Sequence, residues 1–227
     1  MVAGMPGAGK SALALVLALN AGVPTLYLSA DSSARTQAVR LLAHRTGQEQ
    51  ATCEMWLDAY PEWAQQQLAG GEHIRWCFES APTLQDIEEE LDAYIVANGA
   101  PPHLLVVDNL SDVVAGEGDG EFAGLRALNK DLKFFARHYD LCVVALHHIS
   151  ESTEHKCEPC PPRAAVHGKV NQVPALVLTI ASQPDGASMW IAPVKNRTGP
   201  ADRTGRTAVQ LVFDPGSMTL TDPMTRR

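Results

Sequence analysis

Short, mainly apolar runs alternate with longer amphipathic stretches over the first two thirds of the chain. Unbroken runs of this kind predict strands that are buried on both faces of a parallel sheet. They cover residues 25–29, 103–107 and 141–146, with a weaker candidate at 74–78. Helical spacing of apolar residues fills the intervals, at 11–20, 34–45, 84–97 and 122–138. The alternation predicts an α/β fold with a mainly parallel sheet flanked by helices.

The last quarter of the chain follows a different pattern. Beyond residue 170, β-like runs are separated by Gly, Pro and Asp turns that leave no room for a crossover helix; these runs are 174–180, 187–191, 208–213 and 218–221. They predict C-terminal antiparallel hairpins that extend the sheet. Two irregular segments, 115–120 and 150–168, are long for a compact domain, and such segments are usually functional or disordered.

The clearest chemical signal is a glycine-rich motif near the start of the chain. Residues 4–11 match G-x-x-x-x-G-K-[ST] at every position, and an apolar helical run follows at once. Glycines let consecutive backbone N–H groups surround a phosphate at a helix N-terminus, Lys10 adds a charge beside the β- and γ-phosphates, and the Ser11 hydroxyl ligates Mg²⁺. The predicted nucleotide contacts are Gly4, Pro6, Gly7, Ala8, Gly9, Lys10, Ser11 and Ala12.

Only three residues precede this motif, whereas a phosphate loop normally ends a strand of about five or six residues. Either the first strand is a stub or the chain lacks an upstream segment. We favour a truncated or incorrectly assigned start.

Two acidic residues at strand ends are candidates for chemistry on the bound nucleotide. Asp108 closes a buried run and is suited to bind Mg²⁺ through water or through Ser11; alternatively it only caps the next turn. Asp31 follows the run at 25–29 and is best placed to orient or deprotonate a water. The alternative for Asp31 is an N-cap of the helix that starts near Ala34.

Composition limits the class of protein. The 227 residues have a mass of 24.4 kDa, 45% hydrophobic positions and a formal net charge of −8, as expected for one globular domain. Neither an 18-residue apolar span nor the pattern of a secretory signal is present, so we expect no membrane partner. Five scattered cysteines suit a reducing compartment, and we expect a cytoplasmic protein.

The acidic total hides an asymmetry. Residues 150–227 hold nine basic and seven acidic side chains, so the acidic excess lies entirely in residues 1–149. Phosphate backbones are bound by clustered Lys and Arg. A polyanion would therefore meet the C-terminal third of the chain.

Several landmarks stand in a fixed order along the chain. The phosphate loop, Asp31, Val-Val-Asp-Asn at 106–109 and Val-Val-Ala-Leu-His-His at 143–148 are followed by Lys-Asn-Arg-Thr-Gly-Pro at 195–200 and Phe-Asp-Pro at 213–215. Together they resemble the RecA-like motor of DnaB-type hexameric replicative helicases, particularly phage versions. The resemblance covers nearly the whole chain. The last two motifs are its most specific part, because a phosphate loop alone occurs in many unrelated families.

The resemblance implies an ATP- and Mg²⁺-dependent motor that moves on single-stranded DNA and unwinds duplex. Asp31 falls where these helicases have a catalytic glutamate, and it is one methylene shorter. His148 aligns with a polar sensor of the γ-phosphate, with His147 as the alternative. Lys195 and Arg197 resemble the pair that reaches the γ-phosphate of a neighbouring subunit, a task that suits the planar, always-charged arginine.

The resemblance also implies DNA contacts and partners. Segments 111–124 and 150–168 would line a central channel, with Lys156, Arg163 and Lys169 as candidates to grip single-stranded DNA; solvated loop cations are the alternative.

His155, Cys157 and Cys160 suggest zinc, but a structural site needs four ligands. The aromatic segment 56–63 is expected to pack over the core beneath an insertion, or to bind a partner.

Residues 1–227 are expected to form a single RecA-like ATPase domain, without the N-terminal domain and linker helix of these helicases. We therefore expect a ring hexamer in the full-length protein, with a primase or loader as a candidate partner, and weak association and low ATPase for this chain alone. The alternative is a RecA- or RadA-like recombination ATPase that forms filaments. A small-molecule kinase is disfavoured, because an Arg-rich lid is lacking.

Overall fold

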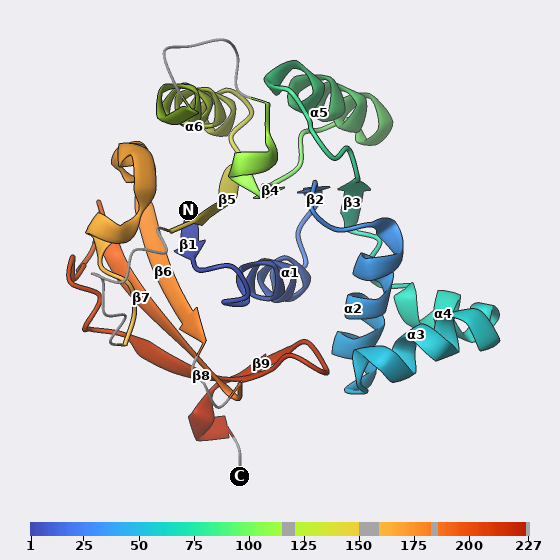
Figure 1. Ribbon diagram of the computed structural model, residues 1–227. Coiled ribbons are helices and arrows are strands. Elements are labelled where there is room, and N and C mark those ends of the chain that lie inside the picture. The colour runs from blue at the N-terminus through green and yellow to red at the C-terminus, as the bar shows by residue number, and fades with distance from the viewer. Residues whose placement is uncertain (115–120, 150–158, 183–185, 226–227) are drawn as a thin grey trace.

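The structure, a computed structural model, describes residues 1–114, 121–149, 159–182 and 186–225. Their strands form one nine-stranded sheet in the order β3-β2-β4-β5-β1-β6-β7-β8-β9 (Figure 1). The strands are β1 (Val2–Gly4), β2 (Thr25–Ser29), β3 (Ile74–Cys77), β4 (Leu104–Asp108), β5 (Cys142–His148), β6 (Leu176–Ser182), β7 (Ser188–Asn196), β8 (Val209–Asp214) and β9 (Thr219–Thr221). The helices are α1 (Lys10–Ala21), α2 (Ala34–Thr46), α3 (Gln50–Ala59), α4 (Pro61–Leu68), α5 (Leu84–Asn98) and α6 (Glu121–His138), with the 3-10 turns η1 (Leu110–Asp112), η2 (Arg163–Ala165), η3 (His167–Gln172) and η4 (Pro223–Thr225).

The sheet has a parallel half and an antiparallel half, as the sequence pattern predicts. Strands β3, β2, β4, β5, β1 and β6 run parallel, and β6 to β9 form successive antiparallel pairs. Strand β1 has only three residues but pairs on both sides, with β5 and β6. Its central place in the sheet fixes the position of the loop that follows it.

Helices cover both faces of the parallel half, with α5 and α6 on one side and α1 and α2 on the other (Figure 1). Successive residues of β4 divide between the two resulting cores: Leu105 and Val107 pack with α5 and α6, and Leu104 and Val106 pack with α1. Because side chains alternate along a strand, Asp108 belongs to the face of Val106. The alternation therefore directs this carboxylate toward α1.

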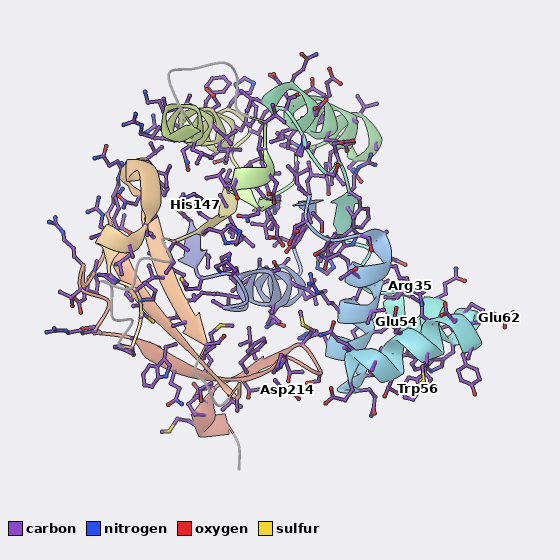
Figure 2. All side chains as sticks on the ribbon, in the orientation of Figure 1. Arg35, Glu54, Trp56, Glu62, His147 and Asp214 are labelled. Carbon is purple, nitrogen blue, oxygen red and sulfur yellow. The ribbon has the colours of Figure 1, made fainter. Side chains whose placement is uncertain are left out.

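Residues 50–68 form two helices that the sequence pattern does not predict; the expectation for 56–63 is an aromatic segment that packs over the core beneath an insertion or binds a partner. Helices α3 and α4 pack on α2, and the rings of Trp56 and Trp63 meet edge to face with centroids 5.1 Å apart. Arg35 of α2 holds α3 through Glu54 and Asp58, at 3.2 and 2.7 Å. Figure 2 shows Glu54 and Trp56 at this corner of the molecule. Each helix spans at most three turns, which is too short for a clear amphipathic pattern.

A membrane-spanning helix is not found among the described residues.

Candidate functional site

The glycine-rich loop connects the end of β1 to the start of α1. Gly9 has φ of 85°, and a Cβ at this position would lie 2.5 Å from Cε of Met189. A Cβ on Gly4 would lie 2.8 Å from Cγ1 of Ile180. The loop thus needs glycine at Gly9 for its left-handed backbone, and at both positions for the close approach of β6 and β7. The first turn of α1, which is fully described, holds no acidic side chain and leaves a helix N-terminus suited to an anion.

Lys10 lies inside the loop with only 7% of its surface exposed. Its Nζ donates to the carbonyls of Gly4 and Met5 at 3.2 and 3.0 Å, and lies 3.2 Å from Nδ1 of His148. Burial lowers the pKa of Lys10, whereas the negative charges of Asp108 and Asp31 raise it. The structure therefore holds this cation at the mouth of the loop.

Asp108 joins three elements at the end of β4. Its carboxylate accepts hydrogen bonds from the hydroxyls of Ser11 and Tyr27, both at 3.1 Å, and the residue is 5% exposed. Burial raises the pKa of Asp108, and the two hydrogen bonds oppose that rise. Asn109, rather than Asp108, is the residue that precedes η1, so the structure does not favour the turn-cap alternative.

The donors at this point suit a Mg²⁺ ion that is shared with a nucleotide. A hydroxyl and a carboxylate are hard oxygen ligands, and Mg²⁺ usually takes one or two such protein ligands together with waters and phosphate oxygens. Within the described residues, no cluster of three or more His, Cys, Asp or Glu side chains could hold a metal by itself. The arrangement of Ser11 and Asp108 therefore fits an ion brought with a nucleotide.

Asp31 lies in the exposed turn between β2 and α2. Ser33, not Asp31, caps α2, by accepting a hydrogen bond from the N–H of Thr36 at 3.2 Å. The alternative role of Asp31 as a helix cap is thus wrong. Its charge contributes to the raised pKa of Asp112, after burial as the main cause, and to that of Asp108. Asp31 therefore stands near the loop with its carboxylate exposed.

The two histidines at the end of β5 have different surroundings. The ring of His148 contacts Lys10 through Nδ1 and the amide of Asn109 through Nε2. His147, labelled in Figure 2, is 4% exposed and precedes it on the strand. Of the two, the structure brings His148 to the phosphate loop.

Three residues at this site were not predicted from the sequence: Tyr27, Asn109 and Asp112. Tyr27 pairs with Val106 across β2 and β4, and so shares the face of Asp108. Only the strand order, which the sequence does not give, makes it a neighbour of that acid. Asn109 follows Asp108 directly and Asp112 lies four residues later, and this nearness in sequence was the available signal.

Lys195 and Arg197 lie near the amino end of strand β6, at the edge of the sheet opposite to the strand ends that carry the phosphate loop. Strand β6 runs parallel to β1 with Ile180 beside Gly4, and Lys195 pairs with Val177, three residues nearer to the amino ends of these strands. The phosphate loop follows their carboxyl ends. The pair therefore points away from the phosphate loop of its own chain.

The two cations are held differently. Lys195 Nζ donates to the carbonyls of Asn171, Gln172 and Pro174 at 2.9, 2.8 and 2.6 Å. Burial, and then the charges of neighbouring arginines and Lys133, lower the pKa of Lys195 to about 8. Arg197 is exposed, and among the described residues its guanidinium makes only long contacts, of 3.4 and 3.3 Å, to the carbonyls of Gln172 and Val173. Arg197 is thus the freer of the two.

Two of the three predicted DNA-binding cations lie within the described residues, on the adjacent turns η2 and η3. Arg163 begins η2, and its guanidinium lies 3.4 Å from Oδ1 of Asn171. Lys169 belongs to η3, and Lys156 lies outside the described residues. Cys157 also lies outside them, whereas Cys160 is buried.

Solved structures share this fold at low sequence identity. The chain matches the structure of a DnaB-like replicative helicase, solved with attention to its interactions with primase, with a TM-score of 0.81 and 16% identity over 97% of this chain. It spans 56% of that protein's length. A second solved structure, of an ATPase domain, matches with a TM-score of 0.84, and this chain spans 83% of its length. The RadB recombinase matches with a TM-score of 0.61, and this chain spans 88% of its length. Each match is 16% identical over 97% of this chain.

Sequence relatives are closer. The family model described as an AAA domain matches residues 1–154. The gene 65 protein of Mycobacterium phage D29 is 35% identical over 231 residues, which cover 98% of both chains. The gene 65 protein of Mycobacterium phage L5 is also 35% identical, over 98% of this chain and 85% of its own. This chain therefore belongs to the AAA-domain family, as a phage-related P-loop ATPase with the fold of DnaB-like helicase ATPase domains.

Proposed function

We propose that this chain is the motor core of an ATP-dependent DNA helicase, which hydrolyses ATP between subunits, moves on single-stranded DNA and unwinds duplex during replication. One observation carries the proposal: the phosphate loop and the Lys195–Arg197 pair lie at opposite edges of one sheet. A second subunit, placed head to tail, would supply its cationic edge to the phosphate loop of the first. Such a contact repeats from subunit to subunit and closes into a ring or continues as a filament.

Residues of one subunit would bind and orient the nucleotide. The loop from Gly4 to Gly9 would surround the phosphates, and Lys10 would exchange its carbonyl contacts for phosphate oxygens. Ser11 and Asp108 would hold Mg²⁺, which supplies neutralising charge when bound. Asp31 would orient the attacking water, and as an aspartate it would place that water closer to the backbone, or act more slowly, than a glutamate.

The neighbouring subunit would complete the site. Arg197 has a fixed charge, weak contacts in its own chain and an exposed position, and these properties suit a group that must move to a neighbour's γ-phosphate. Lys195 would support it at the same edge. The chain alone is expected to associate weakly and to hydrolyse ATP slowly; a stable hexamer in light scattering would contradict this expectation.

The DNA and protein partners follow from the likeness to DnaB-like proteins. We infer that the segments after β4 and β5 contact single-stranded DNA, with Lys156, Arg163 and Lys169 as its candidate ligands. The DnaB-like helicase interacts with a primase. We infer a comparable partner, a primase or a loader, for this protein.

A recombination ATPase is the second candidate, supported by the likeness to the RadB recombinase. ATPase activity measured with and without single-stranded DNA, together with unwinding of a forked duplex, separates the two. The helicase proposal predicts both DNA stimulation and unwinding. Stimulation without unwinding would favour the recombinase, and no ATPase activity with DNA would contradict both.

A further inference from the structure

Three side chains in series join the phosphate loop to the turn after β4. Lys10 Nζ lies 3.2 Å from Nδ1 of His148, and Nε2 of the same ring contacts the amide of Asn109. Lys10 and Asn109 are only 7% and 6% exposed. Lys10 and Asn109 are buried and His148 is partly buried, so the direction of one hydrogen bond in this series constrains the direction of the other.

The lysine fixes the proton position on the ring. An ammonium group has only donors, so Nδ1 of His148 must accept from Lys10 and carry no proton. Burial lowers the pKa of Lys10, whereas the nearby carboxylates of Asp108 and Asp31 oppose that change and favour the charged form. The neutral ring therefore carries its single proton on Nε2, the atom that faces Asn109.

Asn109 must then present its oxygen to that proton. With Nδ2 turned to the ring, two N–H groups would face each other, and Oδ1 of Asn109 would be a buried oxygen without a hydrogen bond. A half-turn of the amide exchanges its two atoms and pairs Oδ1 with the Nε2 proton. Buried polar groups are nearly always paired, so we assign this orientation to Asn109.

Asn109 also begins the segment that leaves the site. Its backbone carbonyl accepts a hydrogen bond from the N–H of Asp112 at 3.1 Å, within η1. This turn leads into residues 111–124, the first segment expected to contact DNA. A change at His148 can therefore reach that segment through one side chain.

We propose that Asn109 is a positioning residue, which holds His148 in the Nε2–H tautomer and so links the phosphate site to the segment after β4. A bound triphosphate would attract Lys10, and the ring would lose its donor. Phosphate oxygens only accept hydrogen bonds, so the unprotonated Nδ1 cannot exchange its bond from Lys10 for a bond to phosphate. Asn109 prevents the ring from moving its proton to Nδ1, so His148 registers the phosphate through the lost bond. The link to ATP and DNA rests on the proposed function, whereas the tautomer assignment does not.

The tautomer is tested by long-range ¹H–¹⁵N NMR on the nucleotide-free chain, with the His148 signals assigned from their loss in His148→Gln. The wild type is expected to show the Nε2–H tautomer. In Lys10→Met, which removes the ammonium donor, Asn109 alone should keep the ring in the Nε2–H tautomer. Adding Asn109→Leu, of similar size but without an acceptor, should then shift the ring toward Nδ1–H, whereas adding Asn109→Asp should keep Nε2–H. Asn129→Leu, at a buried asparagine on α6, is the matched control. An Nδ1–H ring in the wild type, or no shift when Asn109→Leu is added to Lys10→Met, would overturn the proposal.

The link to DNA is tested by ATP turnover. Asn109→Leu is expected to lose DNA stimulation by up to about a hundredfold, with nucleotide affinity retained, because only the placement of the sensor has changed. Weaker nucleotide binding with full stimulation would show that Asn109 acts elsewhere. If the wild type lacks DNA-stimulated ATPase, the proposed function fails, and the NMR result still decides the role of Asn109.

Discussion

The two edges of the sheet that carry the functional side chains are built in different ways. At the carboxyl edge, Lys10, Ser11 and Asp108 contact one another or their immediate neighbours, and these contacts are buried or partly buried. At the amino edge, Lys195 and Arg197 donate to backbone carbonyls of their own chain, in a half-exposed setting. The first edge is preorganised for a phosphate. At the amino edge, Lys195 and Arg197 contact neutral carbonyls rather than an anion within the part of the chain that the structure describes. This is the arrangement expected before a neighbouring subunit brings the phosphate of its nucleotide.

A further difference lies within the amino edge. Three short hydrogen bonds fix Lys195, whereas Arg197 makes two long ones. The adjacent cations also differ in chemistry, because burial and like charges lower the pKa of Lys195 to about 8, while an arginine stays charged at all relevant pH values. We infer that Lys195 mainly holds the carbonyls of residues 171–174, and that Arg197 is the group that can reach a neighbour.

The largest effect is expected at the freer cation. Arg197→Ala should lower DNA-stimulated kcat by about 10³-fold or more, because the charge that develops on the transferred phosphoryl group loses its stabilisation in trans. Nucleotide affinity should remain nearly intact, because the phosphate loop is unchanged. Steady-state ATPase and equilibrium binding of a fluorescent ATP analogue measure the two quantities, with Arg137→Ala on the exposed side of α6 as control. A strong loss of nucleotide binding would indicate that Arg197 acts within its own subunit.

Lys195 should affect stability more than turnover. Lys195→Met removes three hydrogen bonds from a charged donor and should lower the free energy of unfolding by about 1 kcal/mol at pH 7. The folded-state pKa, about 8, is below the ordinary value of 10.5, so the unfolded state binds more protons between these values. The wild type should therefore gain stability, relative to Lys195→Met, as pH rises from 8 to 10.5.

Denaturant unfolding of both proteins across this pH range measures the difference. Because Lys195 is partly exposed, solvent screening makes this difference in the free energy of unfolding smaller than the shift in pKa alone would give. Lys130→Met on the exposed face of α6 is the matched control, and it should follow the wild type. Equal slopes for the wild type and Lys195→Met would contradict the role assigned to Lys195.

The smallest effect is expected at Tyr27. Tyr27→Phe removes one of the two hydroxyls that donate to Asp108, worth about 1 kcal/mol, and should weaken Mg²⁺-dependent ATP binding by roughly fivefold. Binding without Mg²⁺ should change less, since the phosphate contacts remain. Isothermal titration with and without Mg²⁺ measures both, and Tyr94→Phe on α5 is the control. Equal losses in the two conditions would argue against a link between Tyr27 and the ion site.

Much of the fold could be predicted from the sequence, because local patterns determine it. Apolar runs predict β2, β4 and β5, and the glycine motif places the loop before α1. The short helices α3 and α4 escaped prediction, since their stability comes from packing on α2 rather than from a long periodic pattern.

The site divides in the same way. Lys10, Ser11 and Asp108 were predicted from motif and strand end. The contact of Tyr27 with Asp108 requires β2 and β4 to be neighbours in register, and the contact of Asn109 with His148 joins two strand ends. Such contacts depend on strand order, a non-local property that composition and periodicity do not carry.

The central claim is that one ATP site needs both edges, from two subunits. Mixing equal amounts of Lys10→Ala and Arg197→Ala, each inactive alone, tests it most directly, with ATPase measured on single-stranded DNA and the wild type at the same concentration. An intact loop then meets an intact Arg197 at some interfaces, and random mixing predicts recovery to about a quarter of wild-type activity. No recovery, in mixtures where the wild type is active, would contradict the claim.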